Sequence, residues 1–338
     1  MAFSLNMTIS IIKLLPMIVV LIVATGWGVC ALYFGDSRIS LFRTVLAVMF
    51  AISGLLALIS LAIPAWRSRL LIIHSVLFIA ILVWWLNIRP SNDRQWQSDV
   101  EKLSYATFQD HLVTVHNIRN FDYKSEFDYQ PGYYTKTFDL DKLEGVDLFA
   151  VYWMGPAIAH TIISFNFGKG NHLAVSIEAR KEKNEGYSTI KGFFRQYELI
   201  YIVADERDII RLRTNYRQNP QEEVYLYRLL APKENAKRLF LDYFKDINKL
   251  YESPAFYNTL TENCTTTIWL HSRINPEHLP FSWKILISGY VPEYLYENGR
   301  IDQRLPFTEL QQHVHINNAA HQADQAADFS ERIRKAPQ

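Results

Sequence analysis

Cysteine is scarce in this chain, with two in 338 residues, and this scarcity excludes a fold held together by a disulfide framework. Cys30 lies in a long uncharged run and Cys264 in the polar part of the chain, so we do not expect them to pair. The sequence also lacks a glycine-rich phosphate loop and the paired histidines of a zinc-binding helix. His313 and His315 have no cysteine or acidic set at ligand spacing beside them, so we predict neither a metal ion nor a cofactor.

An excess of positive charge is absent as well. The chain has 35 lysines and arginines against 34 aspartates and glutamates, which gives a net charge of +1. After Pro90 the acidic residues slightly outnumber the basic ones. Because a surface that binds nucleic acid needs a basic face, we do not expect nucleic acid as a partner.

Charged side chains are missing altogether from three runs near the N-terminus, at 14–34, 44–66 and 70–88. Each run is long enough, or nearly so, to cross the roughly 30 Å hydrocarbon core of a bilayer as a helix. The first run is longer than the apolar part of a cleavable signal peptide, and further runs follow it. We therefore predict a three-helix transmembrane anchor at residues 1–90.

Basic residues beside these runs indicate the orientation of the anchor. Lys13 precedes the first run, and Arg67 and Arg69 lie between the second and the third. Because basic loops stay on the cytoplasmic side, this arrangement places the chain after the third run on the outer side of the membrane.

The remainder of the chain mixes strand-like and helix-like patterns, which predicts an α+β fold. We expect a linker with an accessory helix and strand at 91–118, a main domain at 119–316 and a C-terminal tail at 317–338. Individual elements are predicted as helices at 95–107, 232–250 and 264–273, and as strands at 112–118, 146–153, 196–204 and 224–229.

Two alternating runs on either side of the loop 168–170 predict a β-hairpin. Pairing Phe167 with Asn171 brings the apolar residues of both runs to one face, whereas a shift by one residue would mix the two faces. This register places His160 directly opposite Glu178, on the face away from the core.

The stretch around Cys264 is typical of a polar turn that runs into a helix, with the cysteine in the first turn. Asn263 is suited to cap that helix, because its side-chain oxygen can accept from a free backbone N–H. The positive end of the helix dipole should lower the pKa of a thiol placed there, and the thiolate is the reactive nucleophile. A small buried core cysteine is the alternative interpretation.

Cys264, His160 and Glu178 together supply the residue types that a thiol enzyme needs. Such an enzyme uses a nucleophile, a base that carries its proton and a polar group that orients the base. The alternatives are a hydrogen-bonded structural histidine and an exposed strand carboxylate paired with a basic neighbour. Further candidates for oxyanion or substrate contacts are Asn263, Thr265, Tyr152 and Arg180.

A resemblance to a known family is carried by five stretches, AHTIISFNFG, HLAVSIEAR, FRQYELIYIVADERDII, YNTLTENCTT and PEYLYENGRID. They resemble the periplasmic domain family of Lnb, a bacterial lipoprotein N-acyltransferase, over Arg119 to Arg334. The resemblance implies a permuted papain-like domain of the NlpC/LRAT type, with an antiparallel sheet and a cysteine-bearing helix. It also implies Cys264 as nucleophile and His160 as base. In Lnb further membrane spans follow the domain, whereas in this chain the spans precede it.

With the predicted membrane anchor, this resemblance implies a thiol acyltransferase of the bacterial inner membrane whose domain lies in the periplasm. It would move a fatty acyl chain from a phospholipid, through a thioester on Cys264, to the N-terminal amine of a lipoprotein. One alternative is a membrane-tethered cysteine hydrolase, a peptidase or amidase, that uses the same cysteine and histidine with water as acceptor. Another is a non-catalytic module that binds lipid or lipoprotein.

Overall fold

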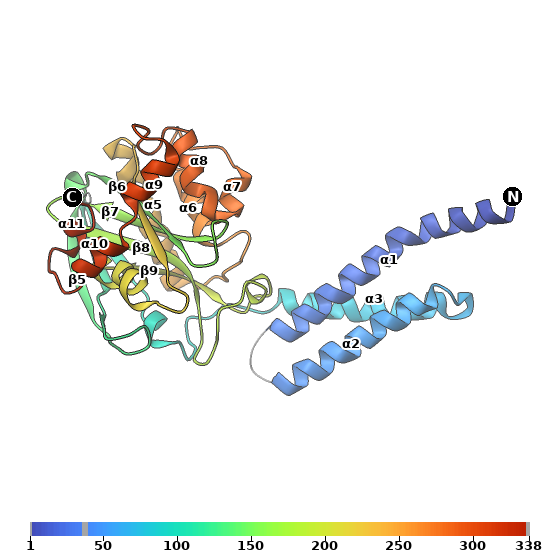
Figure 1. The fold of residues 1–338 in the computed structure, drawn as a ribbon. Coiled ribbons are helices and arrows are strands. Elements are labelled where there is room, and N and C mark those ends of the chain that lie inside the picture. Colours follow the sequence, from blue (N-terminus) through green and yellow to red (C-terminus); the bar gives the residue numbers. More distant parts are fainter. Residues whose placement is uncertain (1, 36–39, 336–338) are drawn as a thin grey trace. The chain divides into compact units, whose positions relative to one another are not determined.

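The computed structural model describes residues 2–35 and 40–335, and Figure 1 shows the chain as a ribbon. It forms two compact units, each built from two segments of the chain. The helical unit comprises Met1–Pro90 and Ser188–Gln196, and the sheet unit comprises Ser91–Tyr187 and Tyr197–Gln338.

Three long apolar helices make up most of the helical unit, namely α1 (Ala2–Phe34), α2 (Ser40–Ser60) and α3 (Pro64–Leu86). Many of their large apolar side chains are exposed, which suits a lipid environment rather than water. The prediction of three helices able to span a membrane is confirmed. The stretches long and apolar enough to do so are Leu14–Phe34, Leu41–Ser60 and Pro64–Leu86.

Small and polar residues hold these helices together, as is typical of bundles in lipid. Gly28 on α1 packs directly against the Phe50 ring on α2 and leaves no room for a Cβ. His74 on α3 is buried, and its ring hydrogen-bonds Thr25 Oγ1 at 3.2 Å and Ser53 Oγ at 3.0 Å. Because Thr25 lies on α1 and Ser53 on α2, this one histidine joins all three helices.

The loop 188–196 is distant from the helices in sequence but packs with them as part of the same unit. The Arg195 guanidinium lies over the Trp85 ring, 4.1 Å from its centroid. The same guanidinium donates, at 3.0–3.1 Å, to carbonyls at and just beyond the C-terminal end of α3, those of Trp85, Leu86 and Ile88. The last carbonyls of a helix lack the N–H partner four residues on that the inner carbonyls have, so these contacts let the loop cap α3.

A sheet of eight strands forms the centre of the sheet unit, in the order β1-β2-β9-β8-β7-β6-β10 with β5 also paired to β2. The single pairing of β2 with β9 is parallel, and the other pairings of this described sheet are antiparallel. The strands are β1 (Tyr105–Gln109), β2 (Leu112–Arg119), β5 (Tyr133–Asp139), β6 (Gly145–Tyr152), β7 (Ala159–Asn166), β8 (His172–Arg180), β9 (Glu198–Ala204) and β10 (Glu223–Arg228). A separate small hairpin joins β3 (Asp122–Tyr123) to β4 (Tyr129–Gln130).

Short and long helices surround this sheet. The α-helices are α4 (Glu206–Arg211), α5 (Lys233–Glu252), α6 (Cys264–Ser272), α7 (Trp283–Leu286), α8 (Val291–Glu297), α9 (Phe307–Val314), α10 (Asn317–Gln322) and α11 (Phe329–Arg332). The shorter helical turns are η1 (Ser98–Val100), η2 (Leu140–Lys142), η3 (Lys191–Phe193), η4 (Leu212–Tyr216) and η5 (Ser288–Tyr290).

Helices cover both faces of the sheet, because the strands direct alternate apolar side chains to either side. On one face Ile163 and Val175 belong to the hydrophobic core that includes α5, with α6 packed beside it. On the other face Ile162 and Ala174 belong to a second core with α4, α10 and α11. The α+β prediction is confirmed, and the result is a sheet between two helical layers.

The predicted hairpin of β7 and β8 forms in the predicted register, which ends at Ile162 opposite Ser176. Beyond this pair the two strands no longer hydrogen-bond to each other, so His160 and Glu178 are not paired through their backbones. Their side chains nevertheless lie on the same face, with His160 Nε2 3.6 Å from Glu178 Oε1. The predicted proximity of the imidazole and the carboxylate is therefore confirmed.

The predicted helix at 95–107 is wrong. Trp96 forms an isolated β-bridge with Glu182, and η1 and β1 occupy the rest of the segment. The Trp96 ring is buried under the Arg180 guanidinium, which lies 4.1 Å from its centroid. The apolar residues that suggested one face of a helix are instead buried by contacts with distant parts of the chain.

The C-terminal tail expected at 317–338 packs into the second core. Ala320, Phe329 and Ile333 are buried there beside residues of the sheet. Residues 336–338 lie outside the described part of the chain. The described tail is therefore part of the hydrophobic core.

Candidate functional site

Cys264 is the first residue of α6, as the sequence predicted, and Asn263 caps this helix. The Asn263 Oδ1 accepts from the backbone N–H groups of Thr265 at 3.0 Å and Thr266 at 2.9 Å. Its Nδ2 donates to the Thr259 carbonyl at 2.8 Å. Because both ends of the amide are occupied, Asn263 positions the helix start and leaves no free donor for an oxyanion.

In the structure the pKa of the Cys264 thiol is raised, whereas the sequence predicted a lowered one. Burial raises the pKa of Cys264, whereas contacts with the backbone N–H and hydroxyl of Thr161 and with the N–H of Thr265 lower it; burial has the larger effect. The expectation of a lowered pKa was therefore wrong. At neutral pH the resting group is a thiol, and a base must remove its proton before it can attack.

Backbone N–H groups converge beside this thiol. The Thr161 and Thr265 N–H groups contact Cys264. The N–H of Cys264 itself donates to no acceptor in the described part of the chain. The Asn263 Oδ1 accepts from the N–H groups of the next two residues instead. The arrangement can therefore offer at least one free donor to negative charge that develops next to the sulfur.

His160 is oriented by a hydroxyl and a carboxylate on β8. Its Nε2 lies 2.6 Å from Ser176 Oγ, and the Ser176 hydroxyl donates to Glu178 Oε1 at 2.8 Å. Since the hydroxyl has one proton and gives it to Glu178, its oxygen must accept from His160 Nε2–H. The uncharged ring therefore carries its proton on Nε2 and has its lone pair on Nδ1, the atom able to act as a base.

The protonation states of His160 and Glu178 follow from burial and from two neighbouring arginines. Burial, followed by the positive charge of Arg213, lowers the pKa of His160 to about 3, so the ring is neutral at pH 7. Burial would raise the pKa of Glu178, but Arg213, His160 and Arg217 outweigh it and hold that pKa well below its usual value. An ionised carboxylate thus faces a neutral imidazole through Ser176.

Arg213 and Ser176 are the members of this group that sequence reasoning missed. Arg213 donates to Glu178 at 2.9 Å and also pairs with Glu222, which in turn binds Arg217 at 3.1 Å. Ser176 had a signal in the sequence, because it alternates onto the same strand face as Glu178. Arg213 had none, since it lies on a helical turn that reaches the hairpin only through the tertiary fold.

His160 belongs to β7, and Cys264 lies beside the next residue of that strand, Thr161. Thr161 contacts Cys264 and shares the α6 face of the sheet with Ile163, whereas His160 points to the opposite face. Among the described residues no hydrogen bond joins the His160 ring to Sγ. Because β7 and β8 part just beyond Ile162, the two groups lie where the sheet opens.

The other predicted contact residues have structural partners. The Tyr152 hydroxyl donates to the Gly289 carbonyl at 2.7 Å, and the Thr265 hydroxyl donates to the Ile285 carbonyl at 2.8 Å. Arg180 is buried and donates to the Glu101 carbonyl at 2.6 Å. Tyr152 and Thr265 thus secure the segments around α7 and η5, and Arg180 secures the start of the sheet unit.

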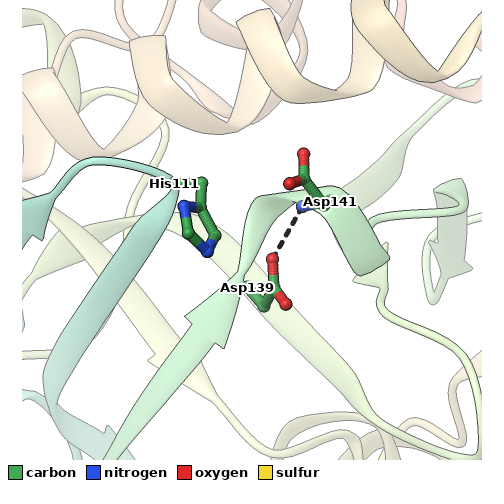
Figure 2. A group of neighbouring side chains, drawn as sticks. All are labelled: His111, Asp139 and Asp141. Carbon is green, nitrogen blue, oxygen red and sulfur yellow. Dashed lines mark hydrogen bonds between the residues drawn. The ribbon is translucent and has the colours of Figure 1, made fainter.

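A second cluster of possible metal ligands lies away from Cys264, at one end of β5. Figure 2 shows His111, Asp139 and Asp141, whose ligand atoms all lie within 4.8 Å of one another. Lys142 contacts Asp139 at 3.2 Å, and Lys237 donates to Asp141 at 2.9 Å. A cation bound here would have to displace these ammonium groups, so we assign the cluster no function.

Comparison with known proteins identifies the part of the chain that carries this site. Residues 129–289 match the family model of the Lnb N-terminal periplasmic domain. This part of the chain is similar to that family, and we call residues 129–289 the Lnb domain. No curated protein and no solved structure matches the chain. The Lnb domain contains Cys264, His160, Ser176, Glu178 and Arg213, and three helices able to span a membrane precede it.

Proposed function

We propose that the Lnb domain is a cysteine acyltransferase of the bacterial inner membrane. Cys264 attacks the ester carbonyl of a phospholipid, the lysophospholipid oxygen leaves with a proton, and the acyl chain is held as a thioester. The N-terminal amine of a lipoprotein then attacks the thioester, forms an amide and returns the proton to the thiol. The observation that supports this most is Cys264 at a capped helix start, next to the strand that bears an oriented neutral histidine.

His160 is the base in this scheme. Its Nδ1 holds the free lone pair, has no hydrogen-bond partner among the described residues and is not fully buried. It would take the thiol proton and give it to the departing lysophospholipid oxygen. The proton transfer requires His160 and Sγ to approach each other or to share a water where β7 and β8 part. Contacts of this kind are often long in proteins without substrate.

The oxyanion of the tetrahedral intermediate would be held by backbone donors. The Cys264 N–H is free, and the Thr161 N–H already contacts the sulfur. Losing one such donor costs about 3 kcal/mol of transition-state stabilisation in comparable sites. The membrane helices keep this chemistry beside its lipid substrates.

Acyl-enzyme formation tests the proposal and separates it from hydrolysis. Full-length protein mixed with phospholipid alone should gain the mass of one acyl chain on Cys264, and a lipopeptide with a free N-terminal amine should then remove it as an N-acyl product. A hydrolase would instead release free fatty acid without the lipopeptide, and a binding module would give neither product. Intact-mass spectrometry follows all three outcomes, with Cys30→Ser as the control that must still acylate.

The rate of acylation should change little with pH between about 5 and 8. Since the pKa of His160 is about 3, the ring stays an unprotonated base throughout this range, and the rate should fall only as the pH approaches 3. Replacing Arg213 by glutamine removes a charge that lowers this pKa, so an inflection should move up toward 6.5. Quenched-flow mass spectrometry measures these rates. An inflection near 6.5 in the native protein would contradict the assignment of His160.

A further inference from the structure

An apolar groove of about 600 Å³ lies among the three helices of the helical unit, within the size range of ligand sites in proteins. Its lining combines side chains of α1, α2 and α3 and has one charged residue, Arg43, among the described residues. The apolar part of the lining includes Leu32, Leu46, Phe50, Leu77, Ile81 and Trp84.

Arg43 has N–H donors that are not used in hydrogen bonds with the described residues. One guanidinium nitrogen donates to the Tyr33 carbonyl at 3.1 Å and the Gly35 carbonyl at 3.2 Å. Its Nε is buried and has no partner among the described residues, although arginine offers five N–H donors in all. Arg43 also lies in the first turn of α2, where the helix dipole adds positive potential. The combination favours an anion over a neutral polar group.

The depth of Arg43 in the membrane follows from the chain. The C-terminal end of α3 leads to the Lnb domain, so this end of the bundle is the periplasmic one. Trp84 and Trp85 mark the same end, as aromatic residues do at a membrane surface. Arg43 lines the groove together with Trp84, which places the guanidinium at the level of lipid phosphates with the apolar lining toward the bilayer centre.

We infer that the helical unit binds one phospholipid of the periplasmic leaflet in this groove. The phosphate accepts from the free donors of Arg43 by charge-assisted hydrogen bonds, and one acyl chain fills the apolar lining between α2 and α3. A phospholipid is the occupant that joins an anionic phosphate to an acyl chain at this depth of a membrane. The site does not involve Cys264, so it goes beyond the proposed catalytic function.

Native mass spectrometry of the full-length protein tests this inference, with phosphatidylglycerol as the probe. One lipid per chain should stay bound, and Arg43→Gln should weaken the retention at least about tenfold, since the phosphate loses its charge-assisted hydrogen bonds. Arg69→Gln is the matched control, because this exposed arginine lies near the start of α3 and outside the groove. It should bind as the native protein does.

A second variant keeps the charge and fills the groove. Ala80→Phe should reduce retention although Arg43 is intact, and circular dichroism checks that both variants keep their helices.

Diacylglycerol with the same chains should bind poorly, and inorganic phosphate should not compete. Equal retention of phosphatidylglycerol by Arg43→Gln and native protein, or equal binding of diacylglycerol, would overturn the inference. A dimer that excludes lipid would assign the groove to a second copy. Cys264→Ala should retain lipid, so this result is independent of catalysis.

Discussion

Replacing Cys264 by serine should reduce acyl transfer by several orders of magnitude while the fold stays intact. The hydroxyl is a far poorer nucleophile than the thiol, and the whole scheme depends on a covalent intermediate at this atom. Sulfur and oxygen are nearly isosteric here, and the cap of α6 uses Asn263 rather than Cys264. Intact-mass spectrometry should show no rapidly formed thioester, and the amide product should fall with it.

The matched control for this variant is Cys30→Ser, which changes the other cysteine and should transfer acyl chains at the native rate. Thermal unfolding and circular dichroism should not distinguish Cys264→Ser from the native protein. An ester that forms slowly on the new serine would agree with the mechanism, because the hydroxyl would occupy the position of the thiol. Full transfer activity in Cys264→Ser would refute the assignment of the nucleophile.

His160→Ala provides the intermediate case. General-base assistance typically contributes 10²–10⁴-fold, so this variant should keep a free thiol that acylates slowly. The comparison separates the nucleophile from the base. Cys264→Ser should lose the thioester, and His160→Ala should still form it over longer times.

The hairpin and the helix cap could be predicted because both follow from local patterns. Alternation over β7 and β8 permits one register with a coherent apolar face, and that register brought His160 close to Glu178. Asn263 before Cys264 is a local capping signal as well. Each of these features is decided by residues that are near one another in sequence.

What depends on burial and long-range packing could not be read in the same way. The pKa of Cys264 was mispredicted because the local helix dipole lowers it, whereas the desolvation that raises it comes from the assembled fold. The contact of Arg213 with Glu178 likewise requires a helical turn to meet the hairpin. The segment 188–196 carries no local sign that it belongs with the membrane helices.

The tail contributes a buried ion cluster whose loss should have the largest effect on stability. Arg334 donates to Asp147 at 2.7 Å and to Glu206 at 2.6 Å, and both carboxylates are fully buried. Removing one partner of a buried pair typically costs about 3–5 kcal/mol, because a charge stays buried without compensation. Arg334→Met should therefore lower the melting temperature of the Lnb domain by roughly 10 °C.

The pH dependence of this effect distinguishes a lost charge pair from lost packing. Burial would raise the pKa of Glu206, but Arg334 outweighs it and lowers that pKa to about 2. In the native protein this pair stabilises the fold above the unfolded pKa of about 4.5, and the contribution is lost as the pH falls toward 2. In Arg334→Met the buried carboxyl group can take up a proton, so the difference between the two proteins should shrink on acidification.

Arg332→Met is the matched control for this prediction, because Arg332 lies only two residues before Arg334, at the end of α11. Arg332 pairs with Asp328 at 2.8 Å, but the two side chains are 49% and 42% exposed, and such surface pairs contribute at most about 1 kcal/mol. Differential scanning fluorimetry at pH 7 and pH 4 measures both variants. Equal melting temperatures for the two would mean that the Arg334 cluster does not stabilise the fold, whereas a large loss for Arg334 alone would establish the tail as part of the domain's core.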